Sequence, residues 1–376
     1  MERRPLRIAF VGSRGVPALY SGFETAATEI CQRLVERGHD VTVYCRKGYG
    51  DESEPTYRGI KKRYLTRLNV KVADTLSHTF LSLMDCAMNP PDVILVVNPA
   101  NGPLCVIPRL RGIPFAINVD GLEWKRGKWP WIGQRYFYFA SWFCTKIAPA
   151  IIADNRGIQD FYQKQWGSGS YYASYGANVE EFANPSVLGE YGLRPDGYFL
   201  VVARLEPENN AELIVRAFEA VNTDKQLIIV GGSNYPGGWQ RRLQESVRDA
   251  RIRFLDGIYD QTKLTEVICN SYAYIHGHMV GGTNPILLKA LGCGACVLYA
   301  DVDFNAEVVQ GAGIPFLLNV DGARQVFQRM VDQPALRAEF RARAPQRIRD
   351  AYTWDMVADA YEELCYRLVE GRPPYS

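Results

Sequence analysis

The stretch MVGGTNPILLKALGCG at residues 279–294 has the pattern of a glycine loop that leads into a helix. It follows a strand-like run from Ala273 to His278, passes through Asn284-Pro285, and continues as an apolar helical pattern that ends at Gly294. Glycines let bare backbone N–H groups approach a ligand, and the helix behind them adds the positive end of its dipole. The sequence therefore favours an anion-binding loop, although an ordinary strand-to-helix connection has the same pattern.

Length and composition indicate a globular protein of two domains. The chain has 376 residues, more than a domain with a single hydrophobic core usually contains. Hydrophobic residues make up 47% of it and charged residues 22%, as in ordinary globular proteins. A formal net charge of +2 at pH 7 gives no reason to expect nucleic acid as a partner. No apolar run reaches the ~18 residues that cross a bilayer, and the N-terminal run suits a first strand better than a signal peptide. We therefore expect a cytoplasmic protein.

The nine cysteines show no disulfide framework. They are odd in number and scattered through apparent strands and helices, as reduced buried thiols are. Only Cys293 and Cys296 form a Cys-x-x-Cys, whereas a zinc site needs a second pair of ligands. His276 and His278 point the same way along one expected strand, and Cys293-Gly294 also suits a simple helix end. We expect no metal.

Apolar patterns of strands and helices alternate along the chain. The run from Leu6 to Gly12 predicts a strand buried on both faces, a helix with apolar residues from Phe23 to Val35 follows, and the next strand spans Asp40 to Cys45. Strands joined through a helix pair in parallel. The alternation continues to about residue 165 and resumes at Tyr198, which predicts an α/β protein with two Rossmann-like halves.

Turn residues and weak periodicity mark residues 183–197 as the interdomain linker. We therefore predict an N-terminal, acceptor-side domain over residues 1–185 and a C-terminal donor domain over residues 186–355. A helix expected from Thr353 to Glu370 has one apolar face, so we expect residues 356–376 to pack back on the first domain. In open sheets of this type ligands lie beyond the carboxyl ends of the strands.

The loop from Gly12 to Gly22 follows the first expected strand. Gly12, Gly15 and Gly22 permit a tight turn, Arg14 offers a planar fork of donors, and Glu24 begins the next helix. The spacing is not the Gly-x-Gly-x-x-Gly of dinucleotide-binding proteins. A dehydrogenase is therefore disfavoured.

The segment ARLEPENN at residues 203–210 ends the first expected strand of the second half. Its Arg204 would face the cleft, where a guanidinium can neutralise a diphosphate leaving group. An exposed arginine in a surface turn is the alternative. The glycine loop at residues 281–282 favours the first interpretation, because both loops end strands of one sheet.

The segment NVDGLEWKR at residues 118–126 ends a strand of the first half. Its carboxylates Asp120 and Glu123 can orient sugar hydroxyls or serve as a base. A turn whose Asp and Gly are chosen for backbone geometry explains the same residues.

Basic and aromatic residues are concentrated in WKRGKWPWIGQRYFYFASWF at residues 124–143. Arginine, lysine and tryptophan beside an aromatic helix suit an anionic membrane interface. A core helix whose aromatic face meets the sheet is the alternative. Base stacking is disfavoured by the near-neutral chain.

Together these segments resemble a known family. GSRGVP at 12–17 with YSGFET at 20–25, VDGLEWKR at 119–126, ARLEPENN at 203–210, and HGH at 276–278 with GGTNP at 281–285 occur in this order. They resemble bacterial glycosyltransferases of family four, and most of all the rhamnosyltransferase-type branch of capsule and cell-wall polysaccharide synthesis. The resemblance extends from residue 6 to about residue 366.

The resemblance implies a GT-B fold, in which two Rossmann-like domains face a central cleft and a C-terminal helix crosses back to the first domain. It also implies metal-independent transfer from a nucleotide sugar with retention of anomeric configuration. No side-chain nucleophile is needed, because the leaving phosphate is thought to assist the incoming hydroxyl on the same face. Stabilising that phosphate would then be the main catalytic contribution.

Site residues follow from the resemblance by motif. The catalytic residues would be Asp120, Glu123 and Arg204. The donor-binding residues would be Gly12, Arg14, Gly15, Arg204, Glu206, His278, Gly281, Gly282, Thr283, Asn284, Pro285 and Lys289. The acceptor side would be lined by Tyr20, Phe23, Glu24 and Trp124.

Lys289 departs from the family pattern. Family-four enzymes usually carry two glutamates separated by seven residues, and Gly281 and Lys289 stand at those positions. Gly281 is normal for this branch, but Lys289 replaces an acceptor-only carboxylate with a donor-only ammonium. Either the donor ribose is held differently, or Lys289 meets a phosphate, or donor binding is weakened. The usual lysine after Arg204 is also absent, so Lys289 can supply the missing charge.

The expected function is a hexosyltransferase that moves L-rhamnose from dTDP-L-rhamnose to a lipid-linked or polysaccharide acceptor at the inner face of the cell membrane. The donor is a dTDP- or UDP-linked substrate, and no cofactor is expected. A UDP-sugar epimerase shares the two-domain cleft and is the alternative enzyme. A degenerate, non-catalytic glycan-binding or partner subunit is the alternative that Lys289 motivates.

Overall fold

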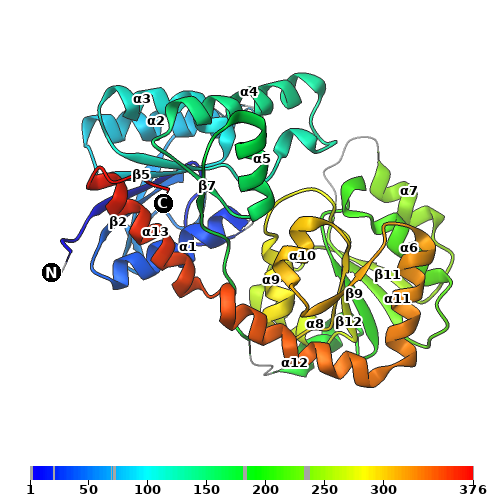
Figure 1. The fold of residues 1–376 in the computed structure, drawn as a ribbon. Helices are drawn as coiled ribbons and strands as arrows, with labels where there is room; N and C mark the ends of the chain where they lie inside the picture. The colour runs from blue at the N-terminus through cyan, green and yellow to red at the C-terminus, as the bar shows by residue number, and fades with distance from the viewer. Residues whose placement is uncertain are drawn as a thin grey trace. The chain divides into compact units, whose positions relative to one another are not determined.

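The computed structural model describes residues 3–19, 22–68, 70, 73–180, 184–232 and 238–375. The chain divides into two compact units (Figure 1). The first contains Met1–Trp124, Trp131–Tyr175 and Trp354–Ser376. The second contains Lys125–Pro130 and Gly176–Thr353.

The first unit is built on an eight-stranded sheet with the order β3-β4-β2-β1-β5-β6-β7-β8. All its pairings are parallel except that of β3 with β4. In the register Ile8 lies opposite Val41 on one side and Val93 on the other. The strands are β1 (Arg7–Val11), β2 (Asp40–Arg46), β3 (Thr56–Tyr57), β4 (Ile60–Leu65), β5 (Val93–Val97), β6 (Phe115–Asn118), β7 (Ala150–Ala153) and β8 (Tyr171–Tyr172).

Helices cover both faces of this sheet. Figure 1 shows α2, α3 and α4 on one face and α1 with α13 on the other. The short helix η1 (Pro99–Cys105) contacts both α2 and α4. The short helix η2 (Glu123–Lys125) begins in this unit, and its last residue, Lys125, belongs to the second unit. The helices of the unit are α1 (Gly22–Glu36), α2 (Asp74–Met88), α3 (Val106–Leu110), α4 (Trp131–Ile147), α5 (Arg156–Trp166) and α13 (Trp354–Val369).

The second unit has a six-stranded, wholly parallel sheet with the order β11-β10-β9-β12-β13-β14. Its strands are β9 (Tyr198–Val202), β10 (Gln226–Val230), β11 (Ile252–Leu255), β12 (Ala273–His276), β13 (Val297–Ala300) and β14 (Gly313–Phe316). Its helices are η3 (Pro185–Tyr191), η4 (Pro207–Asn209), α6 (Ala211–Glu219), α7 (Trp239–Ser246), α8 (Gln261–Cys269), α9 (Pro285–Gly292), α10 (Asp303–Val309), α11 (Val320–Asp332) and α12 (Pro334–Ala351).

Unbroken apolar strands form the two cores. β5 reads VILVV and every residue of it is buried, as expected for a parallel strand covered on both faces. In the second unit the ring of Phe199 lies 5.5 Å from that of Phe218 and 5.2 Å from that of Tyr272. Two parallel-sheet α/β units result, and the predicted pair of Rossmann-like halves is confirmed.

The change from the first unit to the second lies at Tyr175–Gly176. Ala177 N donates to Tyr352 O at 2.8 Å, and Glu180 N donates to Gly292 O at 3.0 Å. These bonds attach the chain after Tyr175 to the second unit, whereas the sequence prediction placed the boundary after residue 185. The segment that turn composition marked, residues 183–197, therefore lies within the second unit.

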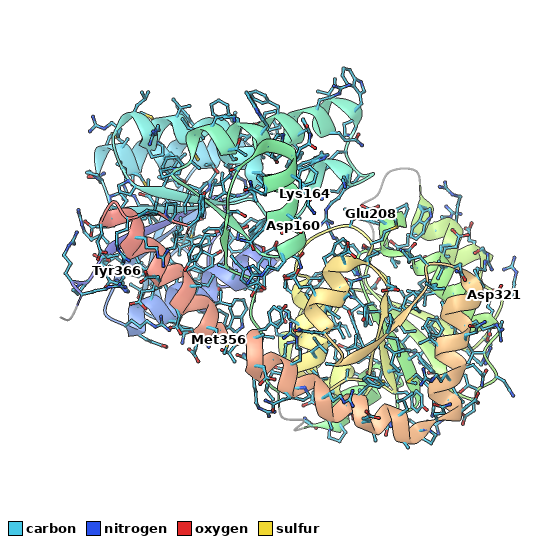
Figure 2. The ribbon with its side chains drawn as sticks, viewed as in Figure 1. Asp160, Lys164, Glu208, Asp321, Met356 and Tyr366 are labelled. Atoms are coloured by element: carbon cyan, nitrogen blue, oxygen red, sulfur yellow. The ribbon has the colours of Figure 1, made fainter. Side chains whose placement is uncertain are left out.

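The last helix, α13, belongs to the first unit. Its buried face contains Val357, Tyr361, Leu364 and Cys365, and the helix packs against α1. Figure 2 labels Met356 and Tyr366 at its two ends, and Tyr366 OH donates to Arg4 O at 3.1 Å. The unit is therefore completed by residues that come more than a hundred positions after the rest of it.

Candidate functional site

The second sheet changes direction between β9 and β12, which are neighbours in space although two strands separate them in sequence. The connection after β9 leads towards one edge of the sheet, and the connection after β12 leads towards the other. Such a point leaves a crevice beyond the carboxyl ends of the two strands, where ligands bind in open α/β sheets. Residues 203–210 and 277–284 follow these two strands.

The loop after β9 places an arginine beside buried acceptor atoms. The Arg204 side chain is 51% exposed, and its Nη1 lies 3.4 Å from Oε1 of Glu206, whose side chain is only 6% exposed. Asn209 Nδ2 donates to Arg204 O at 2.8 Å and fixes the turn. Glu208, labelled in Figure 2, is also buried. Within the described residues, Glu206 Oε2, Glu208 Oε1 and Asn209 Oδ1 are buried without a hydrogen-bond partner.

Unpaired buried oxygens are rare in folded proteins, because each loses its hydration without a replacement. Three of them lie in one loop, which also contains the exposed guanidinium of Arg204, so this loop is a candidate site for a polar ligand. The arrangement offers acceptors for hydroxyl or N–H groups and a cation for an anionic group.

The loop after β12 is bonded directly to the loop after β9. Asn210 Nδ2 donates to Gly277 O at 2.8 Å, and Met279 N donates to Glu208 O at 3.1 Å. A Cβ on Gly277 would lie 2.5 Å from Asn209 O, so only glycine allows this approach. The two predicted donor loops therefore form one continuous surface in the second unit.

Two stacked histidines support this surface. The rings of His276 and His278 stack with centroids 4.3 Å apart. β12 ends at His276, so the strand predicted to extend to His278 is two residues too long. Burial lowers the pKa of His276 to about 3. Burial also lowers the pKa of His278 well below its usual value, with further contributions from His276 and the charges of Arg126 and Arg204. The imidazole of His278 is therefore neutral at physiological pH. Its backbone is held by Asn305, whose side-chain amide donates to His278 O at 2.9 Å.

The glycine loop ends at a capped helix. Gly281 has φ of +147°, a conformation that favours glycine, and Thr283 is buried. The Asn284 side chain accepts from Ile286 N at 3.2 Å, and Pro285 occupies the first turn of α9. The predicted helix over residues 285–292 has the observed bounds of α9. Lys289 is half-buried one turn farther along α9.

One residue near this loop was not predicted. Segment Lys125–Pro130 packs with the second unit, although the sequence on both sides of it belongs to the first. Arg126 Nη2 lies 3.9 Å from the position that a Cβ would have on Gly281. Arg126 and Arg204 thus bring two guanidinium groups to the same pair of loops. Nothing in the sequence assigns Arg126 to this sheet, because the residues before it match a motif of the first half.

In the first unit the corresponding change of direction lies between β1 and β5. Gly12 has φ of +103°, and a Cβ on it would lie 2.5 Å from Val97 O. Gly15 has φ of +135°, and its Cβ would lie 2.8 Å from Cys45 Sγ. These predicted donor-binding glycines are required by the packing of their own loop. Arg14 N donates to Glu24 Oε1 at 3.1 Å, so the backbone of this loop is held by a buried carboxylate of α1.

The predicted acceptor-side residues lie around a tyrosine that the sequence did not single out. Burial raises the pKa of Tyr175 well above its usual value, and the charges of Asp120 and Glu24 add to the rise. The ring of Phe23 lies 6.4 Å from that of Tyr175. Asp120 has φ of +51°, and its N–H donates to Asn118 Oδ1 at 2.9 Å. Asp120, Glu24 and Phe23 are therefore gathered in one place.

Among the other predicted residues, Trp124 of the acceptor side packs in an aromatic cluster, and Glu123, predicted as catalytic, lies in a short helix. Trp124 is half-buried, and its ring lies 5.5 Å from Tyr138, 5.6 Å from Phe161 and 6.0 Å from Trp166. This aromatic cluster explains the presence of Trp124 by packing. Glu123 begins η2 and is half-buried. Tyr20 lies outside the described residues.

Other chemistry is limited in the described part of the chain. There, no group of three or more His, Cys, Asp or Glu residues is arranged to hold a metal ion. All nine cysteines are buried free thiols. A cavity of about 350 Å³ lies at the amino ends of β1 and β2, lined by Arg7, Asp40 and Asp85 among others. The cavity lies near the amino ends of these strands, whereas the loop with Gly12 and Gly15 follows the carboxyl end of β1.

Comparisons with known families cover most of the chain. Residues 21–170 match the family described as "Glycosyl transferase 4-like domain". Residues 196–332 match the family described as "Glycosyl transferases group 1". The two matches lie in the first and second units and leave only the connecting segment and the ends outside.

Curated relatives are distant. A Campylobacter jejuni N-acetylgalactosamine-N,N'-diacetylbacillosaminyl-diphospho-undecaprenol 4-alpha-N-acetylgalactosaminyltransferase is 25% identical over 177 residues, which are 46% of this chain and 47% of that protein. The O-antigen chain mannosyltransferase B of Escherichia coli is 24% identical over 136 residues, 34% of this chain and 35% of that protein. The chain spans about half the length of the first relative and about a third of the second.

Solved structures share the fold at low identity. Sucrose-phosphate synthase from Thermosynechococcus elongatus superposes with a TM-score of 0.80 at 16% identity, covering 98% of this chain and all of that one. Anabaena HepE in complex with UDP-glucose gives 0.77 at 13% identity, covering 96% of this chain and all of that one. WaaG, a glycosyltransferase involved in lipopolysaccharide biosynthesis, gives 0.71 at 13% identity over 95% of this chain and 99% of its own. The GT-B fold predicted from the sequence is confirmed.

Proposed function

Because the chain belongs to the glycosyltransferases of GT-B fold, we propose that it transfers a sugar from a nucleotide sugar to an acceptor hydroxyl. The observation that carries the proposal is the joined pair of loops after β9 and β12. There the exposed Arg204 shares a loop with buried, unpaired oxygens, and this loop is hydrogen-bonded to the glycine loop that leads into the capped helix α9. Cations and a helix N-terminus next to acceptor atoms suit a molecule that combines a diphosphate with hydroxyl groups.

Arg204 stabilises the leaving diphosphate in this proposal. A planar guanidinium binds phosphate oxygens in pairs, and it is most effective where charge accumulates in the transition state. Arg126 reaches the same glycine loop and adds a second guanidinium. The glycine loop itself holds the phosphate and the sugar, while the buried acceptors Glu206 and Glu208 bind hydroxyl groups of the donor.

Transfer proceeds with retention and without a metal in this proposal. The two arginines supply the positive charge at the diphosphate, and the leaving phosphate takes the proton of the acceptor hydroxyl on the same face of the sugar. The neutral His278 donates or accepts a hydrogen bond at the sugar without competing for the phosphate charge. The nucleotide sugar is a substrate, and no further cofactor enters the reaction.

The acceptor hydroxyl is oriented by residues of the first unit. Asp120 ends β6, and its charge acts together with that of Glu24 on the buried Tyr175. Carboxylates are good acceptors for sugar hydroxyls. We assign to Asp120 the positioning of the acceptor, with Phe23 packing against Tyr175 beside it.

The proposed donor is dTDP-L-rhamnose, and the acceptor is a lipid-linked or growing glycan at the cytoplasmic face of the membrane. The sequence motifs at residues 12–25 and 276–285 support the rhamnosyltransferase-type branch. Lys289 then replaces the usual ribose-binding carboxylate with a cation that reaches a donor phosphate.

Isothermal titration with dTDP and UDP tests donor binding, and mass spectrometry of products from a panel of nucleotide sugars with membrane extract tests transfer. We expect dTDP to bind at micromolar to millimolar concentration and Arg204→Ala to weaken it at least tenfold. Arg216→Ala is the matched control, because Arg216 pairs with Glu219 on the outer part of α6. Absence of binding by both nucleotides at millimolar concentration would refute the proposal.

A non-catalytic glycan-binding or partner subunit is the second candidate, and Lys289 is the residue that favours it. Such a protein would bind dTDP and yield no product with any donor. A UDP-sugar epimerase would instead interconvert UDP-sugars, or release free sugar, in the absence of membrane extract. The same panel of nucleotide sugars therefore separates all three functions.

A further inference from the structure

Helix α4 has two apolar faces. One face packs into the first unit through Phe137, Ala140 and Cys144, which are buried. A helix on the surface of a globular unit normally turns polar residues to the opposite side. In α4 the exposed side instead contains Trp131, Ile132, Arg135, Tyr138, Phe139, Trp142 and Lys146.

These exposed positions form a single stripe, because they recur three or four residues apart along the helix. Trp131 is 71% exposed and Ile132 is 63% exposed, far more than packing against the unit requires. The Phe139 ring lies 5.9 Å from Trp142 and 5.8 Å from Phe143, so neighbouring rings make a continuous apolar surface. Continuous patches of this kind mark sites of interaction with a protein or a membrane.

A second exposed stripe lies on α2. Phe80, Met84 and Met88 are spaced four residues apart and are all exposed, Met88 to 69%. At the end of α3, Leu110 is 81% exposed between Arg109 and Arg111. The helices α2, α3 and α4 cover the same face of the first sheet (Figure 1). Their outward side chains therefore belong to one outer surface of this unit.

The charge of this surface is positive. α4 contains no Asp or Glu, and its exposed stripe includes Arg135 and Lys146. α3 adds Arg109 and Arg111. The two acidic residues of α2 are both neutralised, because Asp74 binds Arg46 at 2.6 Å and Asp85 binds Arg63 at 2.9 Å. A partner for this surface must be apolar at its centre and anionic at its boundary.

We propose that the outer surface of α2, α3 and α4 docks on an anionic lipid bilayer. Tryptophan, tyrosine and phenylalanine side chains favour the interfacial layer, and arginine and lysine extend to the phosphate groups around them. Among the described residues, no helix is both long and apolar enough to cross a membrane. In this proposal the helices lie flat on the bilayer surface, because their exposed side chains face outward from the unit. The proposal rests on the proposed function in one respect, since a lipid-linked acceptor is presented at such a surface.

Vesicle sedimentation with the full chain tests the proposal without nucleotide or acceptor. The probes are vesicles of phosphatidylcholine alone and vesicles of phosphatidylcholine with phosphatidylglycerol. We expect the chain to bind the anionic vesicles at least tenfold more tightly than the neutral ones, with binding that weakens as salt screens the charges. Equal binding to both vesicle types, or no binding to either, would overturn the proposal.

Paired substitutions locate the surface. Trp131→Ser with Ile132→Ser is expected to lower binding at least tenfold, and Arg135→Glu is expected to lower it on anionic vesicles alone. Leu317→Ser in the second unit is the matched control, since Leu317 is 60% exposed and lies outside the surface. Unchanged thermal unfolding establishes that each variant is folded.

Two further results separate this proposal from others. Self-association in sedimentation equilibrium that the α4 substitutions abolish, without vesicle binding, would replace the bilayer by a second copy of the chain. Titration of dTDP on the same variants distinguishes the docking surface from the donor site. Variants that keep nucleotide binding and lose vesicle binding would support the docking surface. A chain that binds vesicles and does not bind dTDP would refute only the proposed donor site.

Discussion

The two sheets change direction in the same way, but the loops at the two points differ in chemistry. Beyond β9 and β12 the second unit has the exposed Arg204 in the same loop as buried, unpaired oxygens of Glu206 and Glu208. Beyond β1 and β5 the first unit has Gly12 and Gly15, each so close to neighbouring atoms that a Cβ would clash. Open acceptor atoms beside a cation characterise one point, and close backbone packing beside the buried carboxylate of Glu24 characterises the other.

This difference indicates how similar sheets serve different ligands. The second point can bind an anion, because its cations and a helix end favour negative charge. In the first unit, Asp120 after β6 and Glu24 of α1 are carboxylates whose charges act on Tyr175, and such charges would disfavour a phosphate beside them. Under the proposed function, the neutral, hydroxyl-rich acceptor would bind the first unit and the anionic donor the second.

Arg204→Ala is expected to give the largest effect. Removing one preorganised charge that stabilises a leaving group typically lowers kcat by about 10²- to 10³-fold. Arg204→Lys should recover only part of the rate, since an ammonium does not reproduce the planar fork of donors. Initial rates of product formation, followed by mass spectrometry, measure both variants. A change below about threefold in Arg204→Ala would remove the basis for assigning the anion to the second unit.

Gly12→Ala is expected to destabilise the first unit without a direct effect on nucleotide affinity. A Cβ would lie 2.5 Å from Val97 O, and φ of +103° is unfavourable for alanine. Together these changes should lower the free energy of unfolding by about 1–3 kcal/mol. Urea unfolding measures the loss, and dTDP titration at low temperature measures the affinity.

The control for this prediction is Gly189→Ala, because a Cβ on Gly189 would meet nothing within 4 Å. It should leave the free energy of unfolding nearly unchanged. A Gly12→Ala variant of full stability and reduced dTDP affinity would assign Gly12 to donor binding, as the sequence predicted, and would weaken the division between the units.

Acid is expected to destabilise both units through buried histidines. Burial lowers the pKa of His276 in the second unit to about 3 and that of His78 in the first to about 4. The unfolded chain binds these protons at about pH 6.5, so stability falls as pH falls below that value. Each histidine should contribute a loss of about 1.4 kcal/mol per pH unit within that window.

Urea unfolding at several pH values measures this slope. His276→Gln should make it shallower, and His78→Gln should do the same from the other unit. A slope unchanged by both variants would mean that carboxylates alone cause the acid sensitivity. Burial is the largest cause of the lowered histidine pKa in both units. The acid sensitivity should therefore occur in both units and should not depend on the charge difference between the two loops.

The sequence predicted the sheets well because their signals are local. Apolar strands such as β5 and the capped start of α9 at Asn284-Pro285 are encoded within a few residues. Arg204 and the glycine loop could be paired in advance, because parallel strands of one sheet place their carboxyl ends at one edge. Predictions of this kind need no knowledge of side-chain packing.

The surroundings of three residues could not be predicted from the local sequence: Arg126, Trp124 and Tyr175. Arg126 and its neighbours Lys125–Pro130 belong to the second unit although the sequence before and after this segment belongs to the first, and only the path of the folded chain determines this. Trp124 matched an acceptor motif, yet three aromatic rings from α4 and α5 surround it. Tyr175 has no motif of its own, and it becomes central only when Asp120, Glu24 and Phe23 approach it.

Lys289→Glu should give the smallest effect and the sharpest test of the second unit. Lys289 is half-buried on α9, one turn beyond the cap at Asn284. If its ammonium reaches a donor phosphate, a carboxylate there would repel the diphosphate and weaken dTDP binding by about 5- to 20-fold, equivalent to about 1–2 kcal/mol. Lys289→Met keeps the length of the side chain and removes its charge, so it should produce a smaller loss. Tighter dTDP binding by Lys289→Glu, with a gain in product, would show instead that Lys289 replaced a ribose-binding carboxylate and impaired the enzyme.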